Sequence, residues 1–478
     1  MSFIGKRAAL HTLGCKVNEY ETDAMRASLE QAGFSIVDFR ECADVYVINT
    51  CSVTNIADRK SRQMISRAKR HNPDAVVVAA GCYVQTALER TGKNVDADIL
   101  IGSGRKSALV EELERYFRAM EEAQRSSGMP GTDPGARGSS PVQEEGPAAI
   151  REVSDVMKER SYEELSLPRI EGHTRAWIKV QDGCNLFCSY CIIPFARGRI
   201  RSRRMEDILE EVARLASQGI REVVLTGIHL SSYGVDHAGD VTEAFGGDGS
   251  SKTWQERSRL IDLIEAVAEI EGIGRIRLGS LEPTIVTEAF VRRISRIGKI
   301  CPHFHLSLQS GCDSVLKRMN RHYTTEEYLD CLTRLRHAFD APAITTDVIV
   351  GFPGESEEEF ACTKQFLEKA RLYETHLFRY SMRAGTKAAR MPDQIPEKEK
   401  ERRLAILAAL DRRMRAAYEQ SREGKEAEVL FEEITRFEGK SVYTGYTREY
   451  IRVYAESAED LRGQVRRVVV GKHCRAYV

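Results

Sequence analysis

The chain has 478 residues, enough for about three domains of ordinary size. Its formal net charge is zero, so overall charge gives no indication of a nucleic-acid partner. It contains no apolar run of membrane-spanning length and no signal-peptide pattern at its start. The 12 cysteines are therefore expected to be reduced thiols or metal ligands, and we predict a cytoplasmic protein.

Residues 1–118 alternate short apolar runs with amphipathic stretches. The apolar runs are 8–13, 45–48, 76–80 and 99–101, and helical periodicity fills 19–32 and 56–69. Short buried strands that alternate with helices predict an N-terminal domain of parallel α/β type.

Residues 119–168 break this pattern. Their centre, 126–135, reads SSGMPGTDPG, a composition rich in Gly, Pro and Ser that is typical of flexible linkers. We therefore expect a linker between the first domain and the second.

Residues 169–400 contain repeated strand–helix units. The strand candidates are 176–180, 222–225, 275–281, 303–308, 344–350 and 375–380. This pattern predicts an incomplete (β/α)6 barrel, a fold that places its chemistry at the C-terminal ends of the strands. A Gly-rich stretch, 235–251, is expected to be a surface insertion.

The remainder of the chain changes character twice. Residues 401–424 are charged and helical in pattern, and we interpret them as a connector. Residues 425–478 show strand-like alternation and predict a small antiparallel β-barrel. The chain as a whole is thus predicted to be of the α/β class.

Three thiols, Cys184, Cys188 and Cys191, follow the first barrel strand at CxxxCxxC spacing. Thiolate is the soft ligand that iron–sulfur clusters require, and a 4Fe–4S cube normally takes four of them. No fourth cysteine follows closely, so one iron would remain open to a ligand outside the protein. The alternatives are a zinc site, which more often pairs CxxC with a second pair or with histidines, or buried structural cysteines.

A second set of thiols lies in the first domain. Cys15, Cys51 and Cys82 each follow an apolar strand candidate, in the stretches HTLGCKVNEYET, VINTCSVT and AAGCYVQ. In a parallel sheet these positions share one edge, where ligands collect. The three thiols can hold a second cluster with one open iron, although a cysteine after a buried strand is often only a small apolar side chain.

Together these motifs resemble the radical S-adenosylmethionine methylthiotransferases over nearly the whole chain. The stretch HTLGCKVNEYET is most similar to the MtaB type, which converts N6-threonylcarbamoyladenosine 37 of tRNA to its 2-methylthio form. The isopentenyladenosine branch typically has Gln-Met-Asn after the first cysteine, where this chain has Lys16-Val17-Asn18. The resemblance implies a methylthiotransferase domain, a radical barrel and a C-terminal TRAM-like RNA-binding domain.

The resemblance also implies cofactors and their residues. Cys184, Cys188 and Cys191 would hold the radical-generating 4Fe–4S cluster, and Cys15, Cys51 and Cys82 the auxiliary one. Two S-adenosylmethionine molecules would be used per turnover, one as radical source and one as methyl donor. No side-chain general acid or base is expected. The strand-end residues expected around S-adenosylmethionine are Gly227, Ser280, Glu282, Gln309, Gly351 and Tyr380.

The implied partners are tRNA and a reducing protein of the flavodoxin or ferredoxin type. Arg466, Arg467, Lys472 and Arg475 are candidates for phosphate contacts, although acids nearly balance bases in the C-terminal domain. Two basic runs, 59–70 and 197–204, lie close to cysteines and favour a polyanionic substrate.

Other functions remain open from sequence. The substrate can instead be an isopentenyladenosine tRNA or a ribosomal protein side chain. A non-catalytic iron–sulfur module for electron transfer or cluster storage is a further alternative, but it needs neither open coordination positions nor polar residues at successive strand ends.

Overall fold

The computed structural model describes residues 3–92, 94–127, 149–165, 167, 174–238 and 253–477. The chain divides into two compact units. The first holds the chain up to Glu159 together with Glu163–Leu167 and Phe195–Gly198, and the second holds the remainder. Within the described residues, every helix is too short or too polar to cross a membrane.

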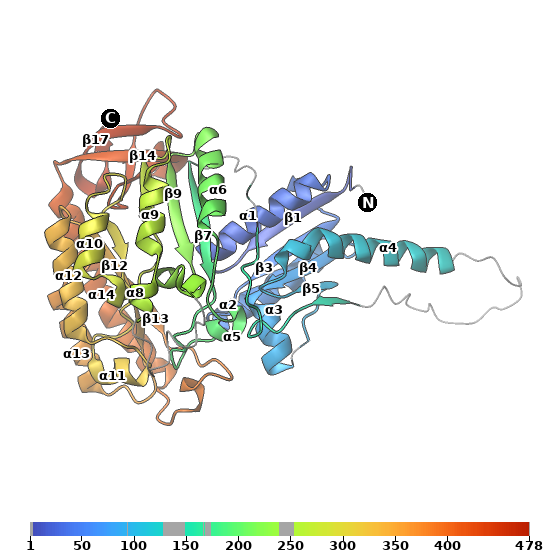
Figure 1. Ribbon diagram of the computed structural model, residues 1–478, viewed down its shortest axis with the longest axis horizontal. Helices are drawn as coiled ribbons and strands as arrows, with labels where there is room; N and C mark the ends of the chain where they lie inside the picture. The colour runs from blue at the N-terminus through green and yellow to red at the C-terminus, as the bar shows by residue number, and fades with distance from the viewer. Residues whose placement is uncertain are drawn as a thin grey trace, which may run out of the picture. The chain divides into compact units, whose positions relative to one another are not determined.

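The first unit is built on a six-stranded parallel sheet of order β2-β1-β3-β4-β5-β6 (Figure 1). Its strands are β1 (Arg7–Thr12), β2 (Ser35–Val37), β3 (Val45–Thr50), β4 (Val76–Gly81), β5 (Ile99–Ile101) and β6 (Ile150–Glu152). Its helices are α1 (Lys16–Gln31), α2 (Asn55–His71), α3 (Cys82–Thr86) and α4 (Leu109–Ser127), with short turns η1 (Ala87–Thr91) and η2 (Lys106–Ala108). The predicted parallel α/β domain is thus confirmed.

The central strands β3 and β4 are buried along their whole length, as expected where helices cover both faces of a parallel sheet. Val45 and Val47 pack into the apolar core on one face, and Tyr46 and Ile48 pack into the core on the other. The continuous apolar runs of the sequence follow from this two-sided burial.

Two elements of this unit extend into the segment expected to be a linker. Helix α4 continues beyond residue 118 to Ser127, and β6 adds a sixth strand beside β5. Of the expected linker centre at 126–135, Ser126 and Ser127 end α4, and 128–135 lie outside the described residues. The domain boundaries themselves stay a prediction.

The second unit contains the six predicted barrel strands. They are β7 (Arg175–Asp182), β9 (Glu222–Gly227), β10 (Arg275–Leu278), β11 (His303–His305), β12 (Ala343–Val350) and β13 (Glu374–Arg379), with a short antiparallel β8 (Arg201–Ser202) beside β7. The sheets β10-β9-β7-β8 and β11-β12-β13 are joined by a parallel bridge between Leu281 and Leu306. The parallel strands therefore follow one another in chain order, as an incomplete (β/α)6 barrel requires.

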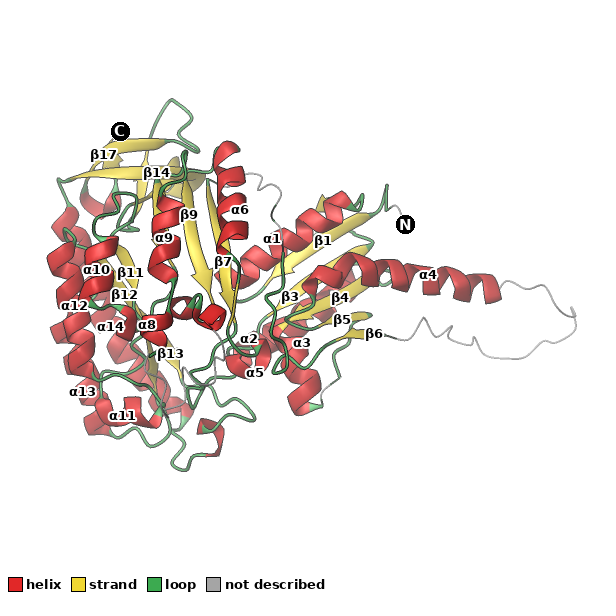
Figure 2. Ribbon diagram, in the orientation of Figure 1, coloured by secondary structure: helices red, strands yellow, loops and turns green. Residues whose placement is uncertain are grey.

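Helices lie outside these strands, as Figure 2 shows. They are α6 (Met205–Ser217), α8 (Trp254–Arg257), α9 (Leu260–Ala268), α10 (Glu288–Ile294), α11 (Asp313–Arg318), α12 (Thr325–Ala338), α13 (Glu357–Ala370) and α14 (Glu397–Arg422). The short helix α5 (Ile193–Arg197) follows the cysteine motif, and its residues from Phe195 onward belong to the first unit. Short turns of 3-10 type are η3 (Leu230–Ser232), η4 (Val235–Ala238), η5 (Pro283–Ile285), η6 (Ala388–Arg390) and η7 (Lys472–Cys474).

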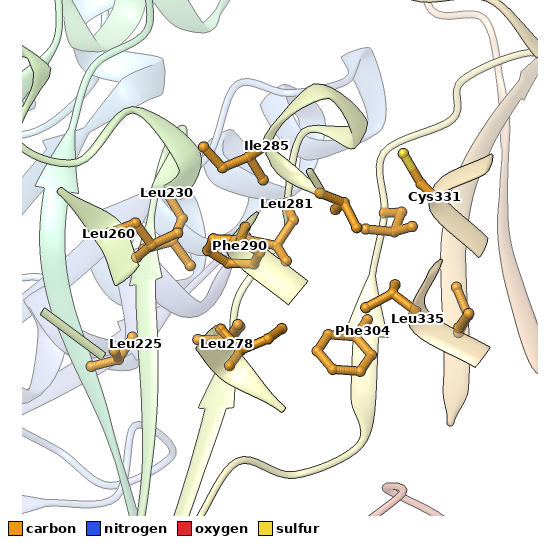
Figure 3. Packing of buried hydrophobic residues seen from close by; sticks show 14 of the residues in the cluster. Leu225, Leu230, Leu260, Leu278, Leu281, Ile285, Phe290, Phe304, Cys331 and Leu335 are labelled. Atoms are coloured by element: carbon orange, nitrogen blue, oxygen red, sulfur yellow. The ribbon is translucent and has the colours of Figure 1, made fainter. Parts of the chain in front are cut away.

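Local sequence determines where two of these helices begin, and apolar packing holds the helices against the strands. Helices α12 and α13 begin at capping boxes, Thr324 with Glu327 and Ser356 with Glu359. The apolar faces of strands and helices then form one core, in which Phe290 approaches Leu278 and Leu281 (Figure 3). The predicted insertion at 235–251 begins with η4, and its residues from 239 onward lie outside the described residues.

The C-terminal segment forms a curled antiparallel sheet of order β16-β15-β14-β17-β18. Its strands are β14 (Glu426–Phe437), β15 (Lys440–Thr447), β16 (Arg452–Ala455), β17 (Val465–Val470) and β18 (Ala476–Tyr477). A bridge between Tyr454 and Arg475 brings the outer strands β16 and β18 together. The curled sheet agrees with the predicted small barrel.

This sheet is fixed to the N-terminal ends of the barrel strands. Arg275 and Arg277 in β10 donate to backbone carbonyls of Glu428 and Thr447, each over 2.7 Å. Both arginines also bind Glu222, the first residue of β9. The C-terminal sheet therefore lies at the opposite end of the strands from the edge where barrel chemistry is expected.

Candidate functional site

The cysteines of the CxxxCxxC motif lie in the loop directly after β7 and are partly exposed. The loop turns tightly, because the Cys191 amide donates to the Cys188 carbonyl over 2.9 Å and Phe187 adopts a left-handed conformation. Removal from water, followed by the neighbouring charge of Cys188, raises the pKa of Cys191 to about 12. The same causes raise the pKa of Cys184 well above its ordinary value. The three thiols are thus gathered in one place, as the prediction requires.

An arginine absent from the sequence prediction contacts this loop. Nη1 of Arg321 lies 3.2 Å from Sγ of Cys188, and its Nη2 donates to Glu282 over 2.6 Å. Arg321 and Glu282 are each only 5% exposed at the side chain, so the ion pair is buried. Arg321 and Cys188 are 133 residues apart in the sequence, so no local sequence pattern predicts their contact.

Glu282 follows β10, as expected, but its carboxylate is already engaged. Burial opposes its charge, yet Arg321 and His229 outweigh burial and lower the pKa of the Glu282 carboxyl. Ser280, two residues earlier, is exposed. Of these two residues expected around S-adenosylmethionine, Ser280 is therefore the more accessible.

Gly227 ends β9 and has a structural reason to be glycine. A Cβ atom there would lie 2.9 Å from Oε1 of Gln181 in the neighbouring strand β7. The same Oε1 accepts a hydrogen bond from the backbone of His229, and the Gln181 amide donates to the carbonyl of Gly183. Gly227 thus leaves room for the glutamine that ties the loop after β7 to the loop after β9.

Gln309 and Gly351 follow β11 and β12, and both have positive φ, 72° and 70°. Gln309 is the more unusual because left-handed backbone is strained for a side chain, and such strain is often found at functional positions. At Gly351 a Cβ atom would lie 2.3 Å from Cγ of Lys400, so both conformation and space demand glycine there.

Tyr380 follows β13 and is 3% exposed. Burial raises the pKa of its hydroxyl to about 12. Among the described residues this hydroxyl has no hydrogen-bond partner, while its ring packs against Phe352 and beneath the Lys400 ammonium group. A buried hydroxyl without a partner is costly, by about 1–3 kcal/mol, and is typical of a position completed by a ligand.

Two other residues at this edge have unpaired buried polar atoms. Both ring nitrogens of His229, two residues beyond β9, and Nδ2 of Asn185, inside the cysteine motif, find no hydrogen-bond partner in the described part of the chain. Side chains after β7, β9 and β13 thus offer polar atoms to a ligand. This donor set fits a polar cofactor bound beside the cysteines. A polar residue shortly after a strand end was the available sequence signal for His229.

The N-terminal cysteines follow three adjacent strands. Register pairs Thr12 with Asn49 and Thr50 with Gly81, so β1, β3 and β4 end at one edge of the sheet. Cys15, Cys51 and Cys82 come directly after those ends. The prediction that these three positions share one edge is confirmed.

Close packing and electrostatics also connect the N-terminal thiols. Gly14 has φ of +112°, and a Cβ atom there would lie 3.0 Å from Sγ of Cys51. Burial raises the pKa of Cys51 to about 12, and the charges of Cys82 and Cys15 contribute in the same direction. Within the described residues, no three His, Cys, Asp or Glu side chains converge on a single metal ion. A cube differs in this respect, because its three thiolates bind three different irons.

A second arginine contacts this set of thiols. Nε of Arg197 lies 3.2 Å from Sγ of Cys82, and the arginine is 1% exposed. In the sequence, Arg197 belongs to the basic run 197–204, which favours a polyanionic substrate. The structure contradicts that interpretation for most of the run, because Arg197, Arg201 and Arg203 are buried and Arg203 pairs with Glu211 over 3.0 Å.

The other basic run is exposed. Arg59, Lys60, Arg62 and Arg70 lie on the accessible face of α2, whose opposite side buries Ile65 among other residues. The exposed cations of α2, and not the segment after Cys191, therefore favour a polyanionic substrate.

The candidate phosphate contacts of the C-terminal sheet fall into two pairs. Arg466 and Arg475 are exposed but form ion pairs with Glu459 and Glu438. Arg467 and Lys472 are exposed, and neither forms an ion pair with another described residue. These two cations are the better candidates for phosphate contacts.

Comparison with known proteins identifies the family. Residues 178–367 match the Radical SAM superfamily, and residues 7–102 match the uncharacterized protein family UPF0004. The threonylcarbamoyladenosine tRNA methylthiotransferase MtaB of Bacillus subtilis (strain 168) is 39% identical over 465 residues, covering 97% of this chain and 93% of that protein. This chain belongs to the radical S-adenosylmethionine methylthiotransferases.

The chain is also similar to a tRNA-modifying enzyme of another name and to a solved structure with the same fold. A tRNA-2-methylthio-N(6)-dimethylallyladenosine synthase of Acetivibrio thermocellus is 33% identical, covering 96% of this chain and 87% of that protein. The radical S-adenosylmethionine methyltransferase TsrM from Kitasatospora setae has a TM-score of 0.50 at 16% identity, covering 78% of this chain and 73% of that one. The latter similarity concerns the fold alone. Membership of the superfamily implies a 4Fe–4S cluster and S-adenosylmethionine.

Proposed function

We propose that this enzyme inserts a methylthio group at C2 of N6-threonylcarbamoyladenosine 37 in tRNA. The observation that carries the proposal is the pair of cysteine triads, one at each functional sheet edge, in a chain 39% identical to a threonylcarbamoyladenosine tRNA methylthiotransferase. A non-catalytic iron–sulfur module would not need the unpaired polar atoms of His229 and Tyr380 beside the barrel triad.

Cys184, Cys188 and Cys191 hold the radical cluster in this proposal. When bound with S-adenosylmethionine, that cluster supplies the one-electron chemistry that removes an unactivated hydrogen, which acid–base groups cannot do. Arg321 keeps the Cys188 sulfur hydrogen-bonded, and Glu282 fixes the arginine. The side chains at this site hold and orient the cluster and S-adenosylmethionine, and none of them needs to act as an acid or a base.

S-adenosylmethionine is held by the residues at the strand ends. Ser280 is accessible for the ribose hydroxyls, and the Tyr380 hydroxyl and His229 ring nitrogens are available as buried hydrogen-bonding groups. Glu282 contributes by orienting Arg321, from which it accepts a hydrogen bond. Gly227 and Gly351 shape the site, because any side chain would collide with Gln181 or Lys400.

Cys15, Cys51 and Cys82 would hold the auxiliary cluster, which would supply the sulfur chemistry of the reaction. Gly14 allows the chain to pass close to Cys51, and Asn18 donates to the carbonyls of Leu13 and Thr50, which flank two of the thiols. These contacts fix the backbone that precedes two of the thiols.

The tRNA is bound in part by Arg467 and Lys472, and the electron comes from a protein of the flavodoxin or ferredoxin type. The same proposal includes a cytoplasmic location, where tRNA is found, and the domain limits 1–118, 169–400 and 425–478.

We prefer the threonylcarbamoyl substrate because Lys16 and Val17 replace the Gln-Met of the isopentenyladenosine branch. We disfavour a ribosomal protein as substrate because both relatives described above are named as enzymes that modify tRNA.

Nucleoside analysis tests this function directly. A host that lacks the enzyme would be complemented with the wild-type chain, the Cys15→Ala variant or Cys362→Ala as control, since Cys362 is exposed and belongs to neither triad. We expect 2-methylthio-N6-threonylcarbamoyladenosine in tRNA with the wild type and the control, and only its precursor with Cys15→Ala. Appearance of 2-methylthio-N6-isopentenyladenosine instead would assign the enzyme to the other branch.

A further inference from the structure

Arg197 is buried inside the first unit although it follows Cys191 of the barrel motif by six residues in the chain. Phe195–Gly198 belong to the first unit, and Arg197 directs its Nε toward Sγ of Cys82 at 3.2 Å. A guanidinium has donors but no acceptor, so it can only donate to the sulfur. A hydrogen bond of this kind is strongest when the sulfur is a thiolate.

Two polar side chains of α1 hold the guanidinium in place. Nη1 and Nη2 donate to the two carboxylate oxygens of Glu21 over 2.5 and 3.0 Å. Nη2 also donates to Oδ1 of Asn18 over 2.6 Å. Because a bidentate arginine–carboxylate pair has a fixed geometry, the direction of Nε toward Cys82 is fixed as well.

Neutralising Glu21 does not require Arg197. Nζ of Lys106 lies 3.0 Å from Oε2 of Glu21, and both side chains are fully buried. Glu21 therefore keeps a cationic partner when Arg197 is replaced.

The barrel triad differs in this respect. Arg321 also donates to a cysteine sulfur, but it is paired with a single carboxylate, Glu282. The carboxylate that holds Arg197 thus also contacts Lys106, whereas the other neighbour of Glu282 is His229.

We propose that Arg197 is a positioning residue of the N-terminal cluster, which hydrogen-bonds Cys82 and favours the reduced state of the cluster. This proposal rests on the assignment of Cys15, Cys51 and Cys82 to that cluster. Reduction adds a negative charge to the cluster, and a fixed neighbouring cation stabilises that charge. Cluster potentials depend on net charge and on hydrogen bonds to the sulfurs, both of which Arg197 alters.

The test is a redox titration of the full-length, anaerobically reconstituted protein in which Cys184, Cys188 and Cys191 are replaced by alanine. Only the N-terminal cluster then contributes to the electron paramagnetic resonance signal. In this background Arg197→Gln removes the charge but leaves Glu21 paired with Lys106. Arg197→Lys keeps the charge but cannot reach Glu21, Asn18 and Cys82 together. Arg204→Gln is the control, because Arg204 is 72% exposed.

We expect Arg197→Gln to retain its iron and to lower the ratio of reduced to oxidised cluster about ten-fold at a fixed ambient potential. For a one-electron couple this equals a shift of about 59 mV toward more negative potential. Arg197→Lys should shift the potential in the same direction by less, and Arg204→Gln should leave it unchanged.

Retained iron with an unchanged potential in both Arg197 variants would overturn the proposal. Loss of iron from both variants, in protein that keeps its fold, would overturn it as well, because the arginine would then be needed for assembly and not for tuning. If the N-terminal triad binds no iron while Arg197 is intact, the proposed function itself fails, and iron content distinguishes that case from the others.

Discussion

Glu222 accepts a hydrogen bond from Nε of Arg277 over 2.7 Å, and both side chains are at most 3% exposed. Arg275 and Arg175 lie 3.5 and 3.9 Å from the same carboxylate. One buried carboxylate thus supports the arginines that join the C-terminal sheet to the barrel. Burial opposes its charge, but the arginines outweigh burial and lower the pKa of the Glu222 carboxyl.

Replacing Glu222 by glutamine should therefore destabilise the second unit, by about 3–5 kcal/mol at pH 7, because it leaves buried arginines without their counter-charge. A carboxyl whose pKa is lowered on folding stabilises the protein above its unfolded pKa of about 4.3 and loses that contribution as pH falls through the folded value. The gap between wild type and Glu222→Gln in urea unfolding should be constant from pH 7 to about pH 5 and shrink on further acidification. A gap independent of pH would show that the charge is not responsible.

Gly351→Ala should reveal how closely Lys400 packs beneath the loop after β12. The added Cβ would lie 2.3 Å from Cγ of Lys400, whose ammonium group is held by Glu397 and by the carbonyl of Tyr380. The matched control is Gly439→Ala, which has a similar positive φ but nothing within 4 Å of the added atom. We expect the unfolding free energy of Gly351→Ala to fall by about 1–3 kcal/mol more than that of the control. Equal losses would mean that only the backbone conformation matters.

Tyr380→Phe tests whether the unpaired hydroxyl serves a ligand. Without ligand the variant should be at least as stable as wild type, since it removes a buried polar group that lacks a partner. Its affinity for S-adenosylmethionine, measured by calorimetry on reconstituted enzyme, should fall about 2- to 10-fold, the effect of one lost hydrogen bond. Tyr328→Phe is the control, because its hydroxyl donates to the carbonyl of Leu306 and its loss should reduce stability without altering affinity. Unchanged affinity in Tyr380→Phe would remove this residue from the cofactor site.

The two pairs of basic residues in the C-terminal sheet should differ in tRNA binding. Combined alanine replacement of Arg467 and Lys472 should weaken binding and reduce the magnitude of the salt slope by roughly 0.7–0.9 per lost phosphate contact. The same treatment of Arg466 and Arg475 should have a smaller effect, because Glu459 and Glu438 already neutralise them. Filter binding across a salt series measures both slopes. Equal slopes in the two variants would contradict the distinction.

Much of the fold could be predicted because its signals are local. Continuous apolar runs predicted the buried strands β3 and β4, and the regular recurrence of strand and helix predicted the barrel. Strands β2 and β6 were missed, since each has only three residues and no fully buried position. The positions of all six cysteines at strand ends followed from the same local patterns.

The charged residues of the site could not be predicted in this way. Arg197 and Arg321 reach cysteines 115 and 133 residues away, and no local pattern records such contacts. A run of arginines also has the same sequence pattern whether its side chains are exposed to water or buried, as Arg201 and Arg203 are. The sequence correctly predicted Glu282 at a strand end, but its hydrogen bond from Arg321 forms only in the folded chain.

Iron and sulfide analysis of the reconstituted enzyme tests the central claim, that two separate cysteine triads each hold a cluster. The wild type and the control Cys362→Ala should contain about eight irons per chain. Alanine replacement of either triad, Cys184, Cys188 and Cys191 or Cys15, Cys51 and Cys82, should leave about four. If the wild type contained about four irons and lost none on replacement of the N-terminal triad, these thiols would bind no cluster and the account of sulfur insertion would be wrong.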